Sequence, residues 1–252
     1  MADGTIYDAM PYRTFARTAT YVGHLAVLGR LLGMDVAPPE RCRVLELGAG
    51  DGGNLIPMAL SLPDSEFVAV DLSLTAIERG RAVAAAGGVT NITLQHGDIT
   101  KLGAELGEFD YVIAHGVFSW VPPAVRTALL PLVRERMRPQ GLAFVSYNAL
   151  PGDHFRNIVR QMMRMHTAAI EDPRTKLEQA RALLQVLAQA PGDAGDVYRP
   201  LLQSEAGRAL QGPDDLLVHD YLADTQPFFF TDFMGAASAA GCSSPRKPCF
   251  TP

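Results

Sequence analysis

The sequence is poor in the residues that build metal centres and disulfide frameworks. It contains three cysteines, Cys42, Cys242 and Cys249, and their spacing fits neither a zinc site nor a set of disulfide pairs. We therefore expect no metal ion in this protein. Lysine is scarce too, because nearly all of the basic residues are arginines.

Long apolar runs and an excess of positive charge are missing as well. No segment approaches the ~20 consecutive apolar residues that cross a bilayer, and Met1–Met10 does not resemble a secretory signal. The net charge of −5 argues against the broad basic surface that nucleic acids require. We therefore predict a cytoplasmic protein that binds neither nucleic acid nor membrane.

Glycine, by contrast, is concentrated in one segment. Residues 44–54 read Val-Leu-Glu-Leu-Gly-Ala-Gly-Asp-Gly-Gly-Asn, so an apolar strand runs into a cluster of glycines just before an amphipathic helix. Glycine allows positive φ angles and the close approach of a ligand to the backbone. A helix start adds free N–H groups and a positive dipole end. This pattern predicts a loop that binds a nucleotide-type cofactor.

Two cofactor templates fit this loop. Gly48, Gly50 and Gly53 satisfy the dinucleotide pattern G-x-G-x-x-G, with Asp71 about 20 residues further on. Glu46, followed by glycines at 48, 50 and 52, equally satisfies the E-x-G-x-G-x-G loop of proteins that bind S-adenosylmethionine (SAM). The loop alone leaves both cofactors open.

Strand-like and helical patterns alternate around the loop. Strands are expected at Arg43–Leu47, Glu66–Asp71, Ile92–Gln95, Phe109–Ala114 and Gly141–Tyr147. Helices are expected between them at Leu55–Leu62, Leu74–Ala86 (with Ser73 as N-cap) and Pro122–Arg138. The alternation predicts an α/β fold with a mostly parallel sheet and helices on both faces. A ligand then binds beyond the carboxyl ends of the strands.

Further helical patterns flank the predicted sheet. They cover Thr14–Leu32, Asp153–Ile170, Lys176–Gln189, Pro200–Leu210 and Thr231–Gly241, the last with Thr231 as N-cap and Gly241 as C-cap. We divide the chain into an N-terminal helical lid (1–40), a cofactor-binding core (41–150), a helical extension or cap (151–241) and an irregular tail (242–252). The tail has no strand pattern, which indicates a truncated or frameshifted end or, alternatively, a natural disordered tail.

Two aspartates follow predicted strands. Asp71 can accept hydrogen bonds from both ribose hydroxyls of either cofactor. Asp98 can accept the exocyclic amine of an adenine while Ile99 covers the ring. The alternatives are a helix-capping or solvated role for Asp71 and an ordinary loop position for Asp98. Among the arginines, Arg156, Arg160 and Arg164 recur at helical spacing, and we expect them to form a solvated face.

The order and spacing of four segments resemble class I SAM-dependent methyltransferases. These segments are the loop beginning at Glu46, Val70–Ser73, Gly97–Ile99 and Phe109–Val112, which together span about 100 residues. Residues 115–123 and 145–152 are similar to bacterial members that carry a downstream methyltransferase regulatory domain, some of which are protein-lysine methyltransferases. The resemblance implies a Rossmann-like fold, SAM as cofactor and methyl transfer to a protein side chain, lysine among them, or to a small molecule.

The resemblance also indicates which residues form the site. We expect the cofactor to be bound by Glu46, Gly48, Gly50, Asp51, Gly52, Asn54, Asp71, Leu72, Asp98, Ile99, His115 and Gly116. Aromatic faces stabilise a sulfonium cation, so Trp120 and Tyr147 are candidates beside Tyr7, Tyr12 and Phe118. An amine acceptor must lose a proton, for which His115 and Tyr147 are our catalytic candidates, with Asp153 and His154 as further ones.

Several alternatives stay open at this point. His115 could hold the methionine end of the cofactor instead, and Phe118 and Trp120 could simply pack the following helix onto the sheet. The chain could be a non-catalytic SAM-binding fragment or regulatory module. A nicotinamide-dependent oxidoreductase is less favoured, because no lysine is placed for the Tyr-x-x-x-Lys pattern of such enzymes. The sequence does not indicate an oligomeric state.

Overall fold

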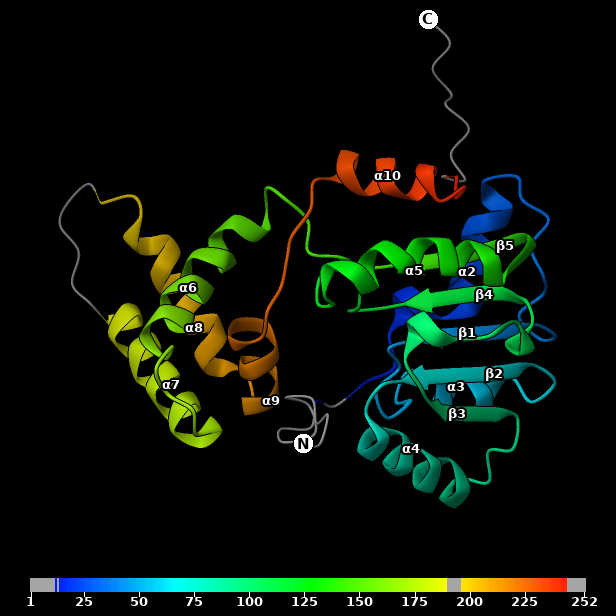
Figure 1. The fold of residues 1–252 in the computed structure, drawn as a ribbon, viewed down its shortest axis with the longest axis horizontal. Helices are drawn as coiled ribbons and strands as arrows, with labels where there is room; N and C mark the ends of the chain where they lie inside the picture. Colours follow the sequence, from blue (N-terminus) through cyan, green and yellow to red (C-terminus); the bar gives the residue numbers. More distant parts are fainter. Residues whose placement is uncertain (1–11, 13, 190–195, 244–252) are drawn as a thin grey trace, which may run out of the picture. The chain divides into compact units, whose positions relative to one another are not determined.

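The computed structural model describes residue 12, residues 14–189 and residues 196–243, which belong to two compact units. One unit comprises Met1–Tyr147 together with Phe228–Pro252 and contains the sheet; the other, Asn148–Pro227, is helical (Figure 1). The division at Asn148 lies close to the predicted end of the core. The last helix differs from the prediction, because it groups with the sheet unit and not with the helical extension.

The sheet has five strands, and every pairing in it is parallel. The strands are β1 (Arg43–Leu47), β2 (Glu66–Asp71), β3 (Ile92–His96), β4 (Phe109–Ala114) and β5 (Met137–Val145). Their order is β3-β2-β1-β4-β5 (Figure 1), so the chain builds outward from β1 in both directions. This arrangement confirms the predicted Rossmann-like α/β fold.

β5 begins earlier than its sequence pattern indicated. Phe109 pairs with Met137, but Tyr111 pairs with Leu142, so the intervening residues of β5 bulge out of the ladder. Gln140 lies in this bulge with φ +64°. The residues after Met137 are typical of turns, so the sequence does not indicate a strand there. β5 pairs in a regular register only after the bulge.

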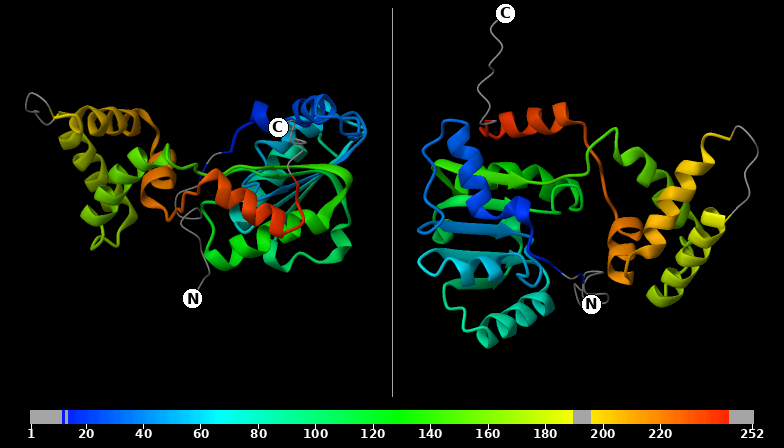
Figure 2. Two further views of the ribbon diagram at one scale, coloured as in Figure 1. Left: turned by 90° about the horizontal axis from the view of Figure 1, so that it is seen from above. Right: turned by 180° about the vertical axis from the view of Figure 1, so that it is seen from behind.

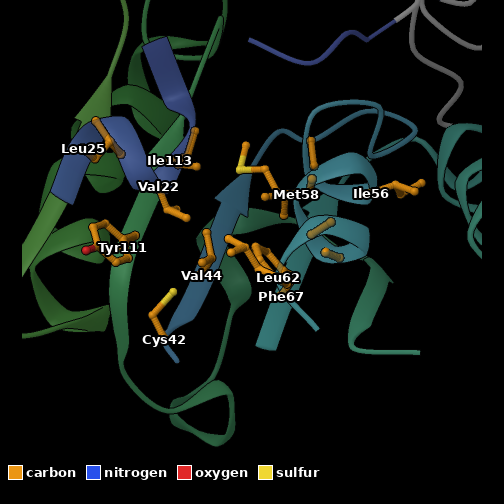
Figure 3. Packing of buried hydrophobic residues seen from close by; sticks show 14 of the residues in the cluster. Val22, Leu25, Cys42, Val44, Ile56, Met58, Leu62, Phe67, Tyr111 and Ile113 are labelled. Carbon is orange, nitrogen blue, oxygen red and sulfur yellow. The ribbon is translucent and has the colours of Figure 1, made fainter. Parts of the chain in front are cut away.

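Helices cover both faces of the sheet (Figure 2). One face carries α2 (Val22–Leu31), α3 (Leu55–Ser61) and α4 (Leu74–Ala86), and the other carries α5 (Pro123–Arg136) and α10 (Phe230–Ala239). Side chains alternate along each strand, so Val44 packs with the first group of helices and Leu45 with the second. Figure 3 shows the first cluster, in which Val22 of α2 and Tyr111 of β4 are both fully buried.

The predicted helix ends agree with the structure at some positions and not at others. The Ser73 hydroxyl accepts a hydrogen bond from the Ala76 N–H (3.2 Å), which confirms the predicted N-cap of α4. The continuous helix predicted over Thr14–Leu32 is wrong, because α2 begins at Val22 after an irregular stretch and a short 3₁₀ turn, η1 (Thr18–Thr20). The predicted N-cap at Thr231 is also wrong: α10 begins at Phe230, and its N-cap residue makes no side-chain cap.

The helical unit contains several buried charged side chains. Its elements are α6 (Asp153–His166), α7 (Pro173–Gln189), α8 (Arg199–Gln211), α9 (Asp214–Leu217) and a π-helical turn, η4 (Val218–Leu222). Arg160 is fully buried between Asp153 (3.2 Å) and the carbonyl of Asp220 (2.7 Å), so the predicted solvated arginine face is wrong at Arg160. Arg164 is exposed as predicted, and Arg156 is half-buried. Tyr221 donates to Glu205 at 2.6 Å.

Residues close to the two ends of the helical unit also meet. The Asn148 amide donates to the Thr225 hydroxyl at 3.0 Å. This contact joins the segment that enters the unit to the segment that leaves it.

Two glycines in helices provide a matched test of the packing around the cofactor loop. A Cβ added to Gly80 of α4 would lie 2.3 Å from the carbonyl oxygen of Asp51, whereas no atom in the part of the chain that the structure describes lies within 4 Å of one added to Gly235 of α10. We expect Gly80→Ala to destabilise the protein by about 1–3 kcal/mol and Gly235→Ala to stabilise it by about 0.5–1 kcal/mol. Urea unfolding measures both, and shifts of the same sign would contradict this packing.

Candidate functional site

The glycine-rich loop connects β1 to α3 in a backbone conformation that requires glycine. Gly48, Gly50 and Gly52 have φ angles of +69°, +58° and +75°. The loop is fixed to the neighbouring strand, because the N–H groups of Gly48 and Ala49 donate to the Val70 carbonyl at 2.8 and 3.1 Å. The sequence pattern therefore identified a turn that only glycine adopts without strain.

Asp71, at the end of β2, holds the middle of this loop. One carboxylate oxygen accepts from the Gly50 N–H at 2.7 Å, and the other accepts from the Ser73 N–H at 2.8 Å. Each carboxylate oxygen has a second lone pair, so these two backbone bonds do not by themselves prevent Asp71 from accepting a ligand hydroxyl. The carboxylate thus shapes the loop, and a ribose role stays open to it.

Glu46, in β1, is a buried carboxyl group with one oxygen unused. Its Oε1 accepts from the Asn54 side-chain amide at 2.8 Å, and its Oε2 has no hydrogen-bond partner among the described residues. Burial raises the pKa of Glu46 to about 8; the Asn54 hydrogen bond opposes this and the negative charge of Asp71 adds to it. A buried oxygen without a partner is costly unless a ligand satisfies it.

The residues before η1 lie against the loop. The Thr14 hydroxyl accepts from the Gly53 N–H at 2.7 Å and bonds the Asp51 carboxylate. That carboxylate also pairs with Arg79 at 3.2 Å. A Cβ on Gly53 would lie 2.5 Å from the Thr14 carbonyl oxygen, so part of the glycine requirement comes from this contact.

Asn54 joins the same N-terminal residues to Glu46. Its Oδ1 accepts from the Arg17 N–H and from the Thr20 hydroxyl, each at 3.0 Å, while its Nδ2 donates to Glu46. Asn54 and Thr20 are both buried. Thr14, Arg17 and Thr20 were not predicted as site residues, because a helix was expected there and nothing in the sequence pairs them with the loop.

At the end of β3, Asp98 caps a short 3₁₀ turn, η2 (Ile99–Lys101). Its Oδ1 accepts from the N–H and the hydroxyl of Thr100 at 2.9 and 2.7 Å, and these bonds lower the pKa of Asp98. Ile99 packs against the core, and Leu72 at the end of β2 exposes 56% of its surface. An exposed leucine beside a strand end provides an apolar face for a planar ring.

His115 and Gly116 follow β4 directly. The His115 ring stacks on Phe144 at 6.2 Å between centroids, and burial, followed by the nearby Arg17 charge, lowers its pKa. The Gly116 N–H donates to the Ser146 hydroxyl at 2.8 Å, and Gly116 has φ +68°. No atom of the described residues lies within 4 Å of a Cβ added there.

Tyr147 and Phe118 pack against other aromatic rings, whereas Trp120 lies in the turn before α5. Tyr147 stacks on Phe233 of α10 at 4.3 Å, and Phe118 is buried beside Phe228 and Phe233 at 5.0 and 5.3 Å. Burial raises the pKa of Tyr147. These contacts give Phe118 a packing role. Trp120 is half-buried in the turn before α5.

The structure thus brings most of the predicted residues to one edge of the sheet. The loop, Asp71 and His115 all lie at carboxyl ends of neighbouring strands. Asp153 and His154 belong to the helical unit, and Tyr7 lies outside the described residues. Within the part of the chain that the structure covers, no three metal-binding side chains cluster. No helix there is long and apolar enough to cross a membrane.

These residues fit an adenosyl cofactor that ends in an amino acid. Asp71 provides acceptors for a ribose beside the positive-φ loop, and Oδ2 of Asp98, which pairs with the exposed Lys101 at 3.4 Å, is the remaining acceptor at the end of β3. The unpartnered Oε2 of Glu46 fits a cationic group. These groups can therefore hold a nucleoside with a cationic tail.

A family model described as a methyltransferase domain matches residues 44–141. That match spans β1 to the bulge of β5 and contains the loop, Asp71, Asp98 and His115.

Proteins of known sequence from Rickettsia prowazekii match almost the whole chain. RP789 is 36% identical over 94% of this chain, which corresponds to 43% of RP789. RP028 is 34% identical over 86% of this chain and 87% of its own length. Both are called uncharacterized proteins.

A solved structure matches both units of the chain. PKMT2 from Rickettsia typhi has a TM-score of 0.83 and 34% identity over 91% of this chain, and a second structure of it contains AdoHcy. This chain covers 44% of PKMT2. It therefore spans less than half the length of PKMT2 and RP789.

Proposed function

Because this chain belongs to the class I SAM-dependent methyltransferases, we propose that it binds SAM at the carboxyl ends of β1 and β2 and transfers a methyl group to the side chain of a protein lysine. SAM is the cofactor of this family. One observation carries the proposal for this chain: two carboxyl groups flank the glycine-rich loop. Asp71 accepts a backbone N–H of the loop, and Glu46 has a buried oxygen without a hydrogen-bond partner among the described residues.

The residues of the chain bind and orient the cofactor. Asp71 accepts the ribose hydroxyls while it holds Gly50 in place, and Glu46 meets the ammonium group of the methionine end. Asp98 accepts the adenine amine, with Ile99 and Leu72 against the ring. Bound SAM supplies an electrophilic methyl group, and holding the acceptor in line with it can contribute ~7–11 kcal/mol to the barrier reduction.

His115 is the group of this site best suited to accept a proton. Its lowered pKa keeps the imidazole neutral at pH 7, so it can take the proton that a lysine ammonium loses before attack. Tyr147, with its raised pKa, stays protonated and acts as a donor if it touches the acceptor. Trp120 presents an aromatic face after β4, the proposed neighbour of the sulfonium cation.

The lysine acceptor rests on the family resemblance and on the similarity to PKMT2. Since the chain corresponds to under half of PKMT2 and RP789, the activity of the whole protein, a downstream regulatory domain and a cytoplasmic location are parts of this proposal. A small-molecule acceptor is the alternative within the same reaction.

Calorimetric titration with S-adenosylhomocysteine, followed by a transfer assay, tests the proposal. We expect a micromolar Kd, roughly −8 kcal/mol, and no binding of NADH as the control. Labelled SAM with lysine-rich protein should then yield methyl-lysine after acid hydrolysis. Binding without transfer would make the chain a SAM-binding module, and no binding by the folded chain would reject the proposal.

A further inference from the structure

We infer that Thr20 is a positioning residue of the cofactor site, which acts through Asn54 to fix the carboxyl group of Glu46 so that its Oε2 receives the ammonium group of the cofactor. This inference rests on the proposed function. It adds a residue that lies outside the glycine loop and more than twenty positions before β1 ends.

The orientation of the Asn54 amide carries the first step. Its Oδ1 lies 3.0 Å from the backbone N–H of Arg17, a group that can only donate a hydrogen bond. The amide oxygen must therefore point to the N-terminal segment, and the amide NH₂ must point to Glu46. The Thr20 hydroxyl, also at 3.0 Å, shares its one proton between this oxygen and the Arg17 carbonyl at 3.0 Å.

The second step assigns the two oxygens of Glu46. Because Asn54 Nδ2 donates to Oε1 at 2.8 Å, Oε1 is the hydrogen-bonded oxygen and Oε2 is the one left for another partner. Glu46, Asn54 and Thr20 are all at least nine-tenths buried, so water does not compete for these bonds. The carboxyl group can rotate only if Asn54 also moves.

The third step identifies the ligand group. Burial raises the pKa of Glu46 to about 8, so an ammonium group beside Oε2 favours the ionised carboxylate and lowers this pKa, whereas the carboxylate of the cofactor tail would repel the ionised form. Asp71 adds negative charge near Glu46, which favours the cation further. Oε2 therefore takes the ammonium, and Thr20 affects binding only through the amino-acid end of the cofactor.

Two ligands separate this role from a structural one. S-adenosylhomocysteine contains the amino-acid end, whereas 5′-methylthioadenosine keeps the nucleoside and the thioether without it. For Thr20→Val, which keeps the shape and loses the hydroxyl, we expect about 5–10-fold weaker binding of S-adenosylhomocysteine and less than a twofold change for 5′-methylthioadenosine. Thr20→Ser should restore the parent affinity for both.

Thr167→Val is the matched control, since Thr167 is equally buried and its hydroxyl donates to the Met163 carbonyl at 2.9 Å within the helical unit. Neither affinity should change in it. Thr20→Ala repeats the measurement if the valine variant does not fold. In a double-mutant cycle, adding Thr20→Val to Glu46→Gln should cost no further affinity.

Each outcome supports or overturns the positioning role of Thr20. If the parent binds both ligands and Thr20→Val loses affinity equally for the two, or for neither, the role of Thr20 is overturned. The proposed function still stands in that case. A parent protein that binds neither ligand would overturn both.

Discussion

Asp71→Ala is expected to weaken binding of S-adenosylhomocysteine at least tenfold, about 1.4 kcal/mol, and to lower the melting temperature. The carboxylate accepts the N–H groups of Gly50 and Ser73, so its loss leaves two donors unsatisfied and frees a loop with three positive φ angles. Hydrogen bonds to a charged group contribute about 1.5–3 kcal/mol each. Calorimetry well below the melting temperature of the variant measures the affinity.

Two variants separate binding from folding in this experiment. Asp71→Asn keeps one acceptor oxygen, so we expect an intermediate loss of both affinity and stability. Asp64→Ala, at an exposed turn before β2, should change neither. Parent-like affinity in Asp71→Ala would reject the ribose role of Asp71, even if the melting temperature falls.

The second large effect is a change in the pH dependence of stability. Glu46 has a higher pKa in the folded protein, about 8, than when unfolded, so the folded state binds more protons. The stability that this group contributes is complete below pH 4.5 and is lost as pH rises through about 8. Glu46→Gln removes the titration, and we expect it to be more stable than the parent at pH 9 by roughly 3–5 kcal/mol.

Urea unfolding at pH 5 and pH 9 measures this difference. The two proteins should be similar at pH 5, where the parent carboxyl group is protonated and resembles the amide. Glu178→Gln, which changes an exposed carboxylate on α7, should track the parent at both values. If the free energies of unfolding of Glu46→Gln and the parent changed with pH in parallel, ionisation of the buried Glu46 carboxyl group would not destabilise the folded protein.

The sequence predicted the parts of this protein that depend on local pattern. The boundaries of β1, β2, β4 and α4 agree with the structure, because apolar runs and a serine cap mark them directly. β5 begins within turn-like residues, and only its pairing with Phe109 reveals this start.

Contacts between distant segments could not be predicted in the same way. Arg160 has the spacing of a solvated residue, but a buried aspartate and a backbone carbonyl from η4 surround it. Thr20 and Asn54 are separated in sequence by α2 and β1, and no periodic pattern connects them. The loop was evident from its glycines, whereas the N-terminal segment that packs on it was not.

The contact between Asn148 and Thr225 has a consequence for how the chain assembles. α10 completes the core of the sheet unit, yet it follows β5 only after the whole of Asn148–Pro227. A flexible connection of that length would impose a loop-closure entropy that grows with its logarithm. If the helical unit folds first, its joined ends shorten the effective loop to a few residues. Substitutions at Thr225 should therefore slow the docking of α10 while the final sheet stays the same.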